Sequence, residues 1–246
     1  KYPQSIIKGN PLMPSFCRFY LESKFAYHLS ENRLLDMLSQ MGMKVAQSTL
    51  NGWMQQIMTS LRERLEPVML ERIRQCVYTQ NEESRIVVRS RESKKDKFKY
   101  NVEYIHAALS MEAKLCVMEY KEGSRSHGVQ EDAIFKDSCI RVFTADRAVL
   151  YETIEKAFKV FLQDGRVEMH NNAVERMFRH LAMGRRNWLH TGSHLGAENI
   201  AFMFSLFESC KLNDINFGDY MEDILTRLME GEQDFMSLIP CNYNSN

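Results

Sequence analysis

Long apolar runs are missing from this sequence of 246 residues. No stretch approaches the roughly 20 apolar residues that a membrane-spanning helix needs, and the start, Lys1 to Gln4, has no apolar signal-peptide core. An initiator methionine is also missing, so we expect a fragment or a processed form. These absences predict a cytoplasmic protein that has no membrane as a partner.

Paired cysteines are missing too. The six cysteines are scattered without any Cys-x-x-Cys pair, at Cys17, Cys76, Cys116, Cys139, Cys210 and Cys241. A disulfide framework or a zinc site has recognisable cysteine spacings, so the sequence predicts reduced thiols. Hydrophobic residues make up 44% and charged residues 26% of the chain. These are ordinary values for a globular protein with a buried core.

The chain has no net charge overall, but one segment is strongly positive. The formal net charge at pH 7 is zero, yet no Asp or Glu occurs from Arg176 to Ala197. This segment contains four arginines, namely Arg176, Arg179, Arg185 and Arg186, together with His180, His190, His194 and Trp188. Positive charge concentrated in a neutral chain is typical of a surface that binds a polyanion. We predict that the four arginines form a basic surface that holds a DNA backbone. The alternative is a merely solvated face, on which Arg176 pairs with a nearby acid and Trp188 is a core anchor.

Residues 1–70 form the first predicted region, with helical periodicity from about Pro14 to Arg64. One predicted helix has an apolar face of Leu34, Leu35, Leu38 and Met41. A second has an inner face of Leu50, Trp53, Met54, Ile57, Leu61 and Leu65. Gly42 separates the two helices, and Ser48 is the expected N-cap of the second. Two short helices around a glycine turn resemble a helix-turn-helix, although many helical bundles share this outline.

Residues 71–190 contain the strand-like segments. The predicted strands are Arg85–Val88, Tyr100–Ile105, Leu115–Tyr120 and Arg141–Thr144. A charged loop is expected at residues 91–97 and a short helix at 130–136. Further helices are predicted at 148–162, 172–181, 198–211 and 218–229. Three antiparallel strands, a helix, a further strand and then helices is the order of a ribonuclease H-like α/β core. Residues 191–246 would be a helical C-terminal tail.

Acidic residues lie where such a core would need metal ligands. Asp146 follows the last predicted strand, Glu82 and Glu83 adjoin the first, and Glu175 begins a predicted helix. Phosphoryl transfer with two divalent ions requires converging carboxylates, since Mg²⁺ prefers hard oxygen ligands. Strand side chains alternate between faces, so only one of Glu82 and Glu83 can point toward the site. With 32 acidic residues in the chain, unrelated surface acids are the alternative interpretation.

A series of ordered motifs adds information that spacing alone does not. They are Pro11–Pro14, Ser23–Leu29, Ser48–Trp53, Tyr78–Ser84, Glu119–Ser126, Phe143–Asp146, Leu162–Arg166, Asn171–Arg176, Gly184–Trp188 and Gly192–Ser193. Over nearly its whole length the chain resembles the insertion sequence 66 family of bacterial transposases. Leu162–Arg166 and the three motifs after it are the most specific.

The resemblance implies an Asp-Asp-Glu transposase with a ribonuclease H-like core, which hydrolyses insertion-element ends and joins them to target DNA using Mg²⁺ or Mn²⁺. Asp146 matches the second catalytic Asp and Glu175 the catalytic Glu, while the first Asp falls on Glu82. These three residues would be both the catalytic residues and the metal ligands. The implied partner is double-stranded DNA, in a bacterial, nucleoid-associated setting, and self-association into a homo-oligomer is left open.

The chain departs from the family pattern in four ways. Glu82 replaces an Asp, and His170 replaces an Asp before the Asn pair. Only 29 positions separate Asp146 from Glu175, where the family has a much longer insert, and upstream segments including a zinc-binding region have no counterpart. We therefore expect impaired catalysis; the alternative is a non-catalytic DNA-binding or oligomerising remnant.

Overall fold

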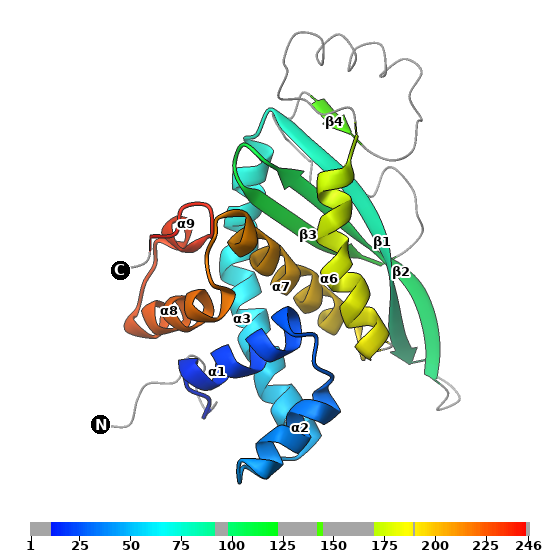
Figure 1. Cartoon of the computed structure of the whole chain (residues 1–246), viewed down its shortest axis with the longest axis vertical. Coiled ribbons are helices and arrows are strands. Elements are labelled where there is room, and N and C mark those ends of the chain that lie inside the picture. The colour runs from blue at the N-terminus through cyan, green and yellow to red at the C-terminus, as the bar shows by residue number, and fades with distance from the viewer. Residues whose placement is uncertain (1–10, 92–97, 123–141, 145–169, 189, 245–246) are drawn as a thin grey trace.

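The computed structural model describes residues 11–91, 98–122, 142–144, 170–188 and 190–244 (Figure 1). Its helices are α1 (Pro14–Leu21), the π-helical turn η1 (Glu22–Ala26), α2 (Glu31–Gln40), α3 (Gln47–Arg74), α6 (Asn172–Trp188), α7 (His194–Leu212), α8 (Phe217–Glu230) and α9 (Phe235–Leu238). Its strands are β1 (Tyr78–Arg91), β2 (Phe98–Ser110), β3 (Leu115–Lys121) and β4 (Val142–Thr144). Among the described helices, none combines the length and apolar character needed to cross a membrane.

The four strands form one mixed sheet in the order β3-β2-β1-β4. β1 pairs antiparallel with β2 and β2 pairs antiparallel with β3, whereas β4 runs parallel to β1. Each of the four predicted strands is present, and the first two are longer than predicted. The class is therefore mixed α/β. The loop expected at 91–97 and the helices expected at 130–136 and 148–162 fall wholly or mostly outside the described residues.

Helix α7 closes the β3 edge of the sheet. Ser205 Oγ accepts from the Met118 N–H at 2.7 Å and lies 3.2 Å from the Met118 carbonyl oxygen. One helical turn later, Ser209 Oγ makes the same pair of contacts with Cys116, both at 3.0 Å. Four helical residues rise about 6 Å and two strand residues about 6.6 Å. The two serines therefore match the N–H and C=O groups of two alternate residues, Met118 and Cys116. The edge is thereby protected from pairing with another chain.

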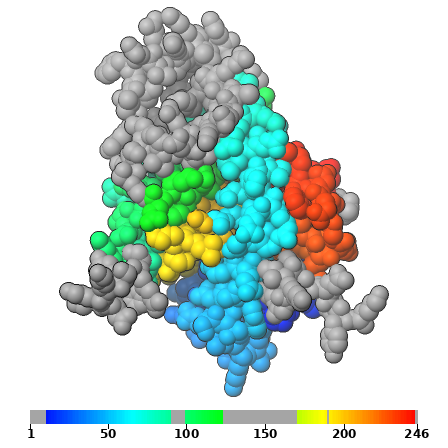
Figure 2. All heavy atoms as spheres, turned by 180° about the vertical axis from the view of Figure 1, so that it is seen from behind, coloured from blue at the N-terminus to red at the C-terminus, as the bar shows by residue number. Residues whose placement is uncertain are grey.

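The second N-terminal helix is much longer than predicted. α3 runs for 28 residues, includes Pro67 and carries a buried face from Leu50 to Ile73. It packs against β2 and β3 and crosses the face of the molecule seen in Figure 2. It begins at Gln47 with Ala46 as N-cap and no side-chain cap, so the prediction of Ser48 as N-cap is wrong. A long core helix replaces the short second helix of the predicted helix-turn-helix outline.

The turn before α3 agrees only in part with the prediction. Gly42 follows α2 with φ of +90°, a left-handed conformation that suits glycine. Leu34 and Leu38 are buried as expected. Met41 is 67% exposed, so its predicted place on the buried face is wrong. The reason is that α2 ends at Gln40, and Met41 belongs to the turn.

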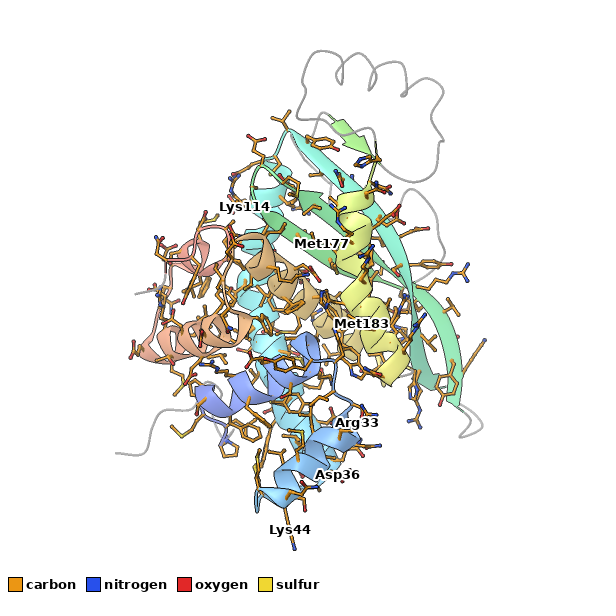
Figure 3. All side chains as sticks on the ribbon, in the orientation of Figure 1. Arg33, Asp36, Lys44, Lys114, Met177 and Met183 are labelled. Atoms are coloured by element: carbon orange, nitrogen blue, oxygen red, sulfur yellow. The ribbon has the colours of Figure 1, made fainter. Side chains whose placement is uncertain are left out.

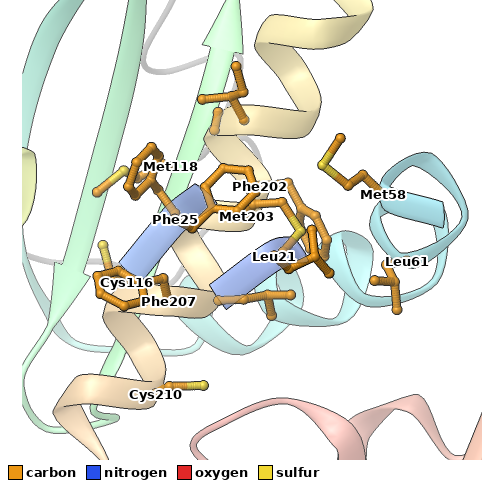
Figure 4. Packing of buried hydrophobic residues seen from close by; sticks show 14 of the residues in the cluster. Leu21, Phe25, Met58, Leu61, Cys116, Met118, Phe202, Met203, Phe207 and Cys210 are labelled. Carbon is orange, nitrogen blue, oxygen red and sulfur yellow. The ribbon is translucent and has the colours of Figure 1, made fainter. Parts of the chain in front are cut away.

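One hydrophobic core joins segments from the whole chain. Leu21 of α1, Phe25 of η1, Met58 of α3, Cys116 of β3 and Phe207 of α7 all belong to it (Figure 4). The proposed boundaries at 70/71 and 190/191 stay predictions. In the structure α3 continues across the first, and α7, beyond the second, packs against β3. The five cysteines in the described part of the chain are free thiols.

A chain of four titratable side chains connects the N-terminal segment to α6 and α7. His28 Nε2 lies 3.0 Å from His180 Nδ1, and His180 Nε2 lies 3.0 Å from Lys211 Nζ. Lys211 Nζ donates to Glu208 Oε2 at 3.0 Å, and Glu208 is fully buried. Burial raises the pKa of Glu208 to about 7, opposed by Lys211. Burial, followed by Lys211 and His28, lowers the pKa of His180 to about 4.

These shifts predict how stability depends on pH. A folded pKa of about 7 for Glu208, against about 4.5 in the unfolded chain, means that only the folded state holds this proton between those values. The stability that this group contributes therefore falls as the pH rises above about 4.5. The last part of that fall, about 1 kcal/mol in the free energy of unfolding, lies between pH 6.5 and 8. His180 has the opposite sign, and its contribution is lost only as pH falls from 6.5 toward 4. Urea unfolding of Glu208→Gln at both pH values should show a correspondingly flatter dependence.

The matched control for this prediction is Glu71→Gln. Glu71 is an exposed residue of α3, and its replacement should leave the dependence on pH unchanged. An undiminished fall in stability between pH 6.5 and 8 in Glu208→Gln would contradict the assignment to Glu208.

Candidate active site

Strand β1 and the start of α6 meet through two polar side chains on one face of the sheet. Asn171, the residue before α6, is buried and donates from Nδ2 to Glu82 Oε2 at 2.7 Å. Two residues earlier on β1, Gln80 Oε1 accepts from the Val174 N–H at 3.3 Å. The first N–H groups of a helix have no partner within it, so Gln80 satisfies one of them. These contacts fix the start of α6 against the strand that carries Glu82.

Glu82 and Glu83 have different surroundings, as strand alternation requires. Glu82 Oε2 meets Asn171, and Glu82 Oε1 accepts from the Glu83 backbone N–H at 3.0 Å. Glu83 lies beside the buried His106, its partner on β2, with 4.0 Å between Oε2 and Nδ1. Burial lowers the pKa of His106, and Glu83 opposes that shift. Glu82 is thus the one of the pair that reaches α6.

Glu175 lies in the first turn of α6, and its side chain is exposed. A carboxylate is favourable there because the helix dipole is positive at its N-terminus. The backbone N–H of Glu175 donates to the Asn171 carbonyl oxygen at 3.0 Å. Asn171 is therefore bonded to Glu82 through its side chain and to Glu175 through its backbone. Two of the three predicted carboxylates belong to one β1–α6 junction.

Asp146, the third predicted carboxylate, lies outside the described residues. The described part of β4 ends at Thr144, which pairs in register with Gln80, two positions before Glu82 on β1. Within the ranges described, no group of three or more His, Cys, Asp or Glu side chains is arranged to hold a metal ion. The predicted triad stays a prediction.

Helix α6 displays its basic side chains in two directions. Arg176, Arg179 and Arg186 are exposed, with Met183 completing a stripe at helical spacing. Met183, which lies on this side of α6, is labelled in Figure 3. The opposite side of the helix is buried through Val174, Phe178 and Leu181. We call the three exposed arginines the α6 arginine stripe; Glu175 adjoins its N-terminal end.

Arg185 does not belong to this stripe. It is half-buried, and its guanidinium donates to the backbone carbonyl oxygen of Arg85 on β1. Burial lowers its pKa. Arg185 lies four residues after Leu181 and therefore on the same side of α6 as the buried Phe178 and Leu181. The structure therefore brings Arg176, Arg179 and Arg186 together and directs Arg185 to the sheet.

The end of α6 anchors the N-terminal segment. Asn187 Nδ2 donates to the His28 carbonyl oxygen at 2.8 Å, and Trp188 Nε1 donates to the Leu29 carbonyl oxygen at 3.2 Å. The Trp188 ring packs against Phe25 and Phe204. It lies so close to Gly184 that a Cβ there would approach the ring to 3.0 Å. The Gly184–Trp188 motif thus has a structural role in addition to its charge.

A polar groove that the sequence did not predict opens beside this anchor. It has a volume of about 660 Å³. Its walls come from η1, the starts of α2 and α3, β1, the end of α6 and the segment that leads into α7. We call it the Lys24 groove; its lining includes Lys24, Asn51, Gly52, Gln55, Asn187 and Trp188. These residues come from separate parts of the chain, and only the motifs Ser23–Leu29, Ser48–Trp53 and Gly184–Trp188 hinted at them.

Comparison with known proteins gives one family and several partial relatives. The family model described as Transposase IS66 family matches residues 11–147 and 144–199. Among curated proteins of Sinorhizobium fredii (strain NBRC 101917 / NGR234), the uncharacterized protein y4hP is 44% identical over 75 residues, which are 30% of this chain and 14% of y4hP. The uncharacterized protein y4qI is 34% identical over 93 residues, 37% of this chain and 17% of y4qI.

The matches are therefore short relative to those curated proteins, and no solved structure matches the chain. The family match falls into two pieces that meet at residues 144–147. That is the place where the sequence predicts a missing segment after Asp146.

Proposed function

This chain belongs to the IS66 family of transposases, and we propose that its β1–α6 junction is part of a site for cleavage and strand transfer of insertion-element DNA. We further propose that cleavage is impaired in this chain. The observation that carries the proposal is the 2.7 Å hydrogen bond between Asn171 and Glu82. It joins the strand of the first implied carboxylate to the helix of the third.

The sheet supports a ribonuclease H-like assignment of the core. Three consecutive antiparallel strands are followed by β4, which lies parallel to β1 on its other side. In this arrangement the strand after β2 and β3 returns next to β1, with Thr144 paired to Gln80 near the start of β1. The direction of β4 therefore leads toward Glu82. We propose that Asp146, two positions after Thr144, joins Glu82 and Glu175 there.

The donor set suits a hard divalent cation. Glu82, Asp146 and Glu175 would hold Mg²⁺ or Mn²⁺ through carboxylate oxygens. Bound ions of this kind stabilise the charge on the attacking and leaving oxygens of a phosphodiester. The chain's own contribution is to orient the ligands, as Asn171 does by bonding Glu82 Oε2.

Impairment follows from how Glu82 is held. Both of its oxygens accept hydrogen bonds from the protein, one from Asn171 and one from the Glu83 N–H. Its side chain is also one methylene longer than the Asp that the family carries. A ligand displaced by about 1 Å can cost on the order of a hundredfold in rate. The shortened connection between Asp146 and Glu175 acts in the same direction.

DNA binding depends on different features, because dispersed phosphate contacts tolerate small displacements. The α6 arginine stripe extends for about 15 Å, since ten helical residues separate Arg176 from Arg186. Its N-terminal end adjoins Glu175. DNA lying along the stripe would therefore pass the proposed site.

A gel-retardation experiment tests the DNA-binding part of this proposal. The purified chain should retard a duplex of about 30 base pairs at 50 mM salt and release it progressively toward 300 mM, because phosphate contacts are salt-dependent. Absence of retardation at low salt would contradict DNA as the substrate. Retardation without measurable cleavage is the result expected of an impaired site, and the alternative, a non-catalytic DNA-binding or oligomerising remnant, predicts it equally.

A further inference from the structure

The Lys24 groove has the size of a small ligand site. Its volume of about 660 Å³ falls within the range of roughly 300–1,000 Å³ that encloses small molecules. One or two nucleotides fit such a space, whereas a full turn of duplex does not. The groove lies at the C-terminal end of α6, opposite the end that carries Glu175.

Lys24 supplies a cation in the groove. Its Nζ lies 5.4 Å from the centre of the Trp188 ring and 5.7 Å from that of Tyr20. Burial lowers its pKa, and Glu31 opposes that shift. Within the described residues Lys24 forms no ion pair. A desolvated ammonium that lines a cavity is a favourable contact for a phosphate oxygen.

The amide side chains of the groove are held in fixed orientations. Asn51 Nδ2 donates to Glu31 Oε2 at 3.1 Å, and Gln47 Nε2 donates to the same oxygen at 3.3 Å. Gln55 Oε1 accepts from Asn199 Nδ2 at 2.7 Å. The other carboxylate oxygen of Glu31 is buried and forms no hydrogen bond in the part of the chain described. Oriented amides and a carboxylate acceptor are groups that recognise the edges of nucleobases.

Gly52 leaves space at the wall of the groove. It lies inside α3, where glycine is less favourable than alanine by about 1 kcal/mol in general. A Cβ built at Gly52 would have no other atom within 4 Å. Packing within the protein therefore does not require glycine at this position. A ligand whose backbone approaches α3 closely would require it.

We infer that the Lys24 groove holds one or two nucleotides of an unpaired DNA strand, with a backbone phosphate at Lys24 and base edges at the amides. This inference rests on the proposed function, because it takes DNA as the substrate. The α6 arginine stripe would hold duplex DNA, and the groove would take a strand that leaves the duplex.

The test uses the full chain and a fluorescein-labelled single strand of about 20 nucleotides, with binding followed by fluorescence anisotropy. Lys24→Gln should weaken binding about tenfold and reduce the salt slope by about 0.7. Gly52→Ala should weaken binding severalfold while raising the midpoint of thermal unfolding, because alanine favours the helix. Lys44→Gln is the matched control, since Lys44 is exposed and points outward at the tip of the α2–α3 turn (Figure 3).

The outcomes separate the two claims. If the wild-type chain binds the strand and both groove variants bind it equally well, the groove inference is wrong and DNA binding stands. If a free nucleoside monophosphate at equal concentration displaces the strand, the groove is a mononucleotide site and the strand assignment is wrong. If the wild-type chain binds neither duplex nor single strand at 50 mM salt, the proposed function and the inference fail together.

Discussion

Replacing Arg176, Arg179 and Arg186 together by alanine should weaken the binding of duplex DNA by on the order of a hundredfold at 100 mM salt. Each phosphate contact that is lost removes a released counterion, so the slope of log K against log salt should become shallower by about 2.7 for three contacts. The three side chains are exposed along one side of α6. Their removal should therefore leave the fold intact, which thermal unfolding can check.

Arg185→Ala is the matched control for the α6 arginine stripe. Its guanidinium bonds the Arg85 carbonyl oxygen, so the variant should lose stability by about 1–2 kcal/mol. Its salt slope should remain that of the wild type. A triple variant with an unchanged slope, or Arg185→Ala with the larger loss of slope, would show that the DNA lies elsewhere.

The orientation of these arginines could have been predicted from helical periodicity. Val174, Phe178 and Leu181 form a buried row, and Arg185 follows at the next i+4 position. The charge of the segment led to the prediction that all four arginines form one surface. Positive charge indicates that a segment meets an anion, whereas the phase of the helix decides which side chains face outward.

Apolar periodicity predicted the existence of elements better than their ends. β1 begins at Tyr78, seven residues before the predicted strand, because the ladder continues through polar positions such as Gln80, which pairs with Leu109. α3 continues through Pro67 to Arg74 because Met69 and Ile73 keep its buried face in contact with the core. In both cases tertiary contacts extend the element beyond its local signal.

The connections within the site could not be predicted from sequence. The bond between Asn171 and Glu82 joins residues 89 positions apart, and the Lys24 groove combines segments that lie up to 176 positions apart, from Lys24 to Ile200. Neither separation leaves a periodic pattern. Their positions at strand and helix ends supplied Glu82 and Glu175 as candidates, the family resemblance matched them to catalytic positions, and the structure supplied the residue that links them.

The largest expected effect concerns cleavage. The chain is incubated with supercoiled plasmid and Mg²⁺ or Mn²⁺. It should produce open circles no faster than Glu175→Gln does. Its cleavage rate would then be on the order of a hundredfold or more below that of a correctly positioned site. Glu82→Asp alone should not restore nicking, because the connection from Asp146 to Glu175 remains short. Agarose gels with and without EDTA provide the measurement.

The physical reason lies in the different tolerances of binding and catalysis. Phosphates bound along the α6 arginine stripe, as proposed, would keep their attraction to the arginines after small shifts. Two-metal chemistry instead depends on the placement of each carboxylate. Glu82 is held by Asn171 and the Glu83 N–H. A shorter side chain at position 82 would lose those hydrogen bonds, and it would not change the position of α6, which carries Glu175. The opposite result would be nicking by the wild-type chain that disappears in Glu175→Gln. If the same nicking persists in the control variant Glu83→Gln, whose side chain lies beside His106, the junction retains a working site.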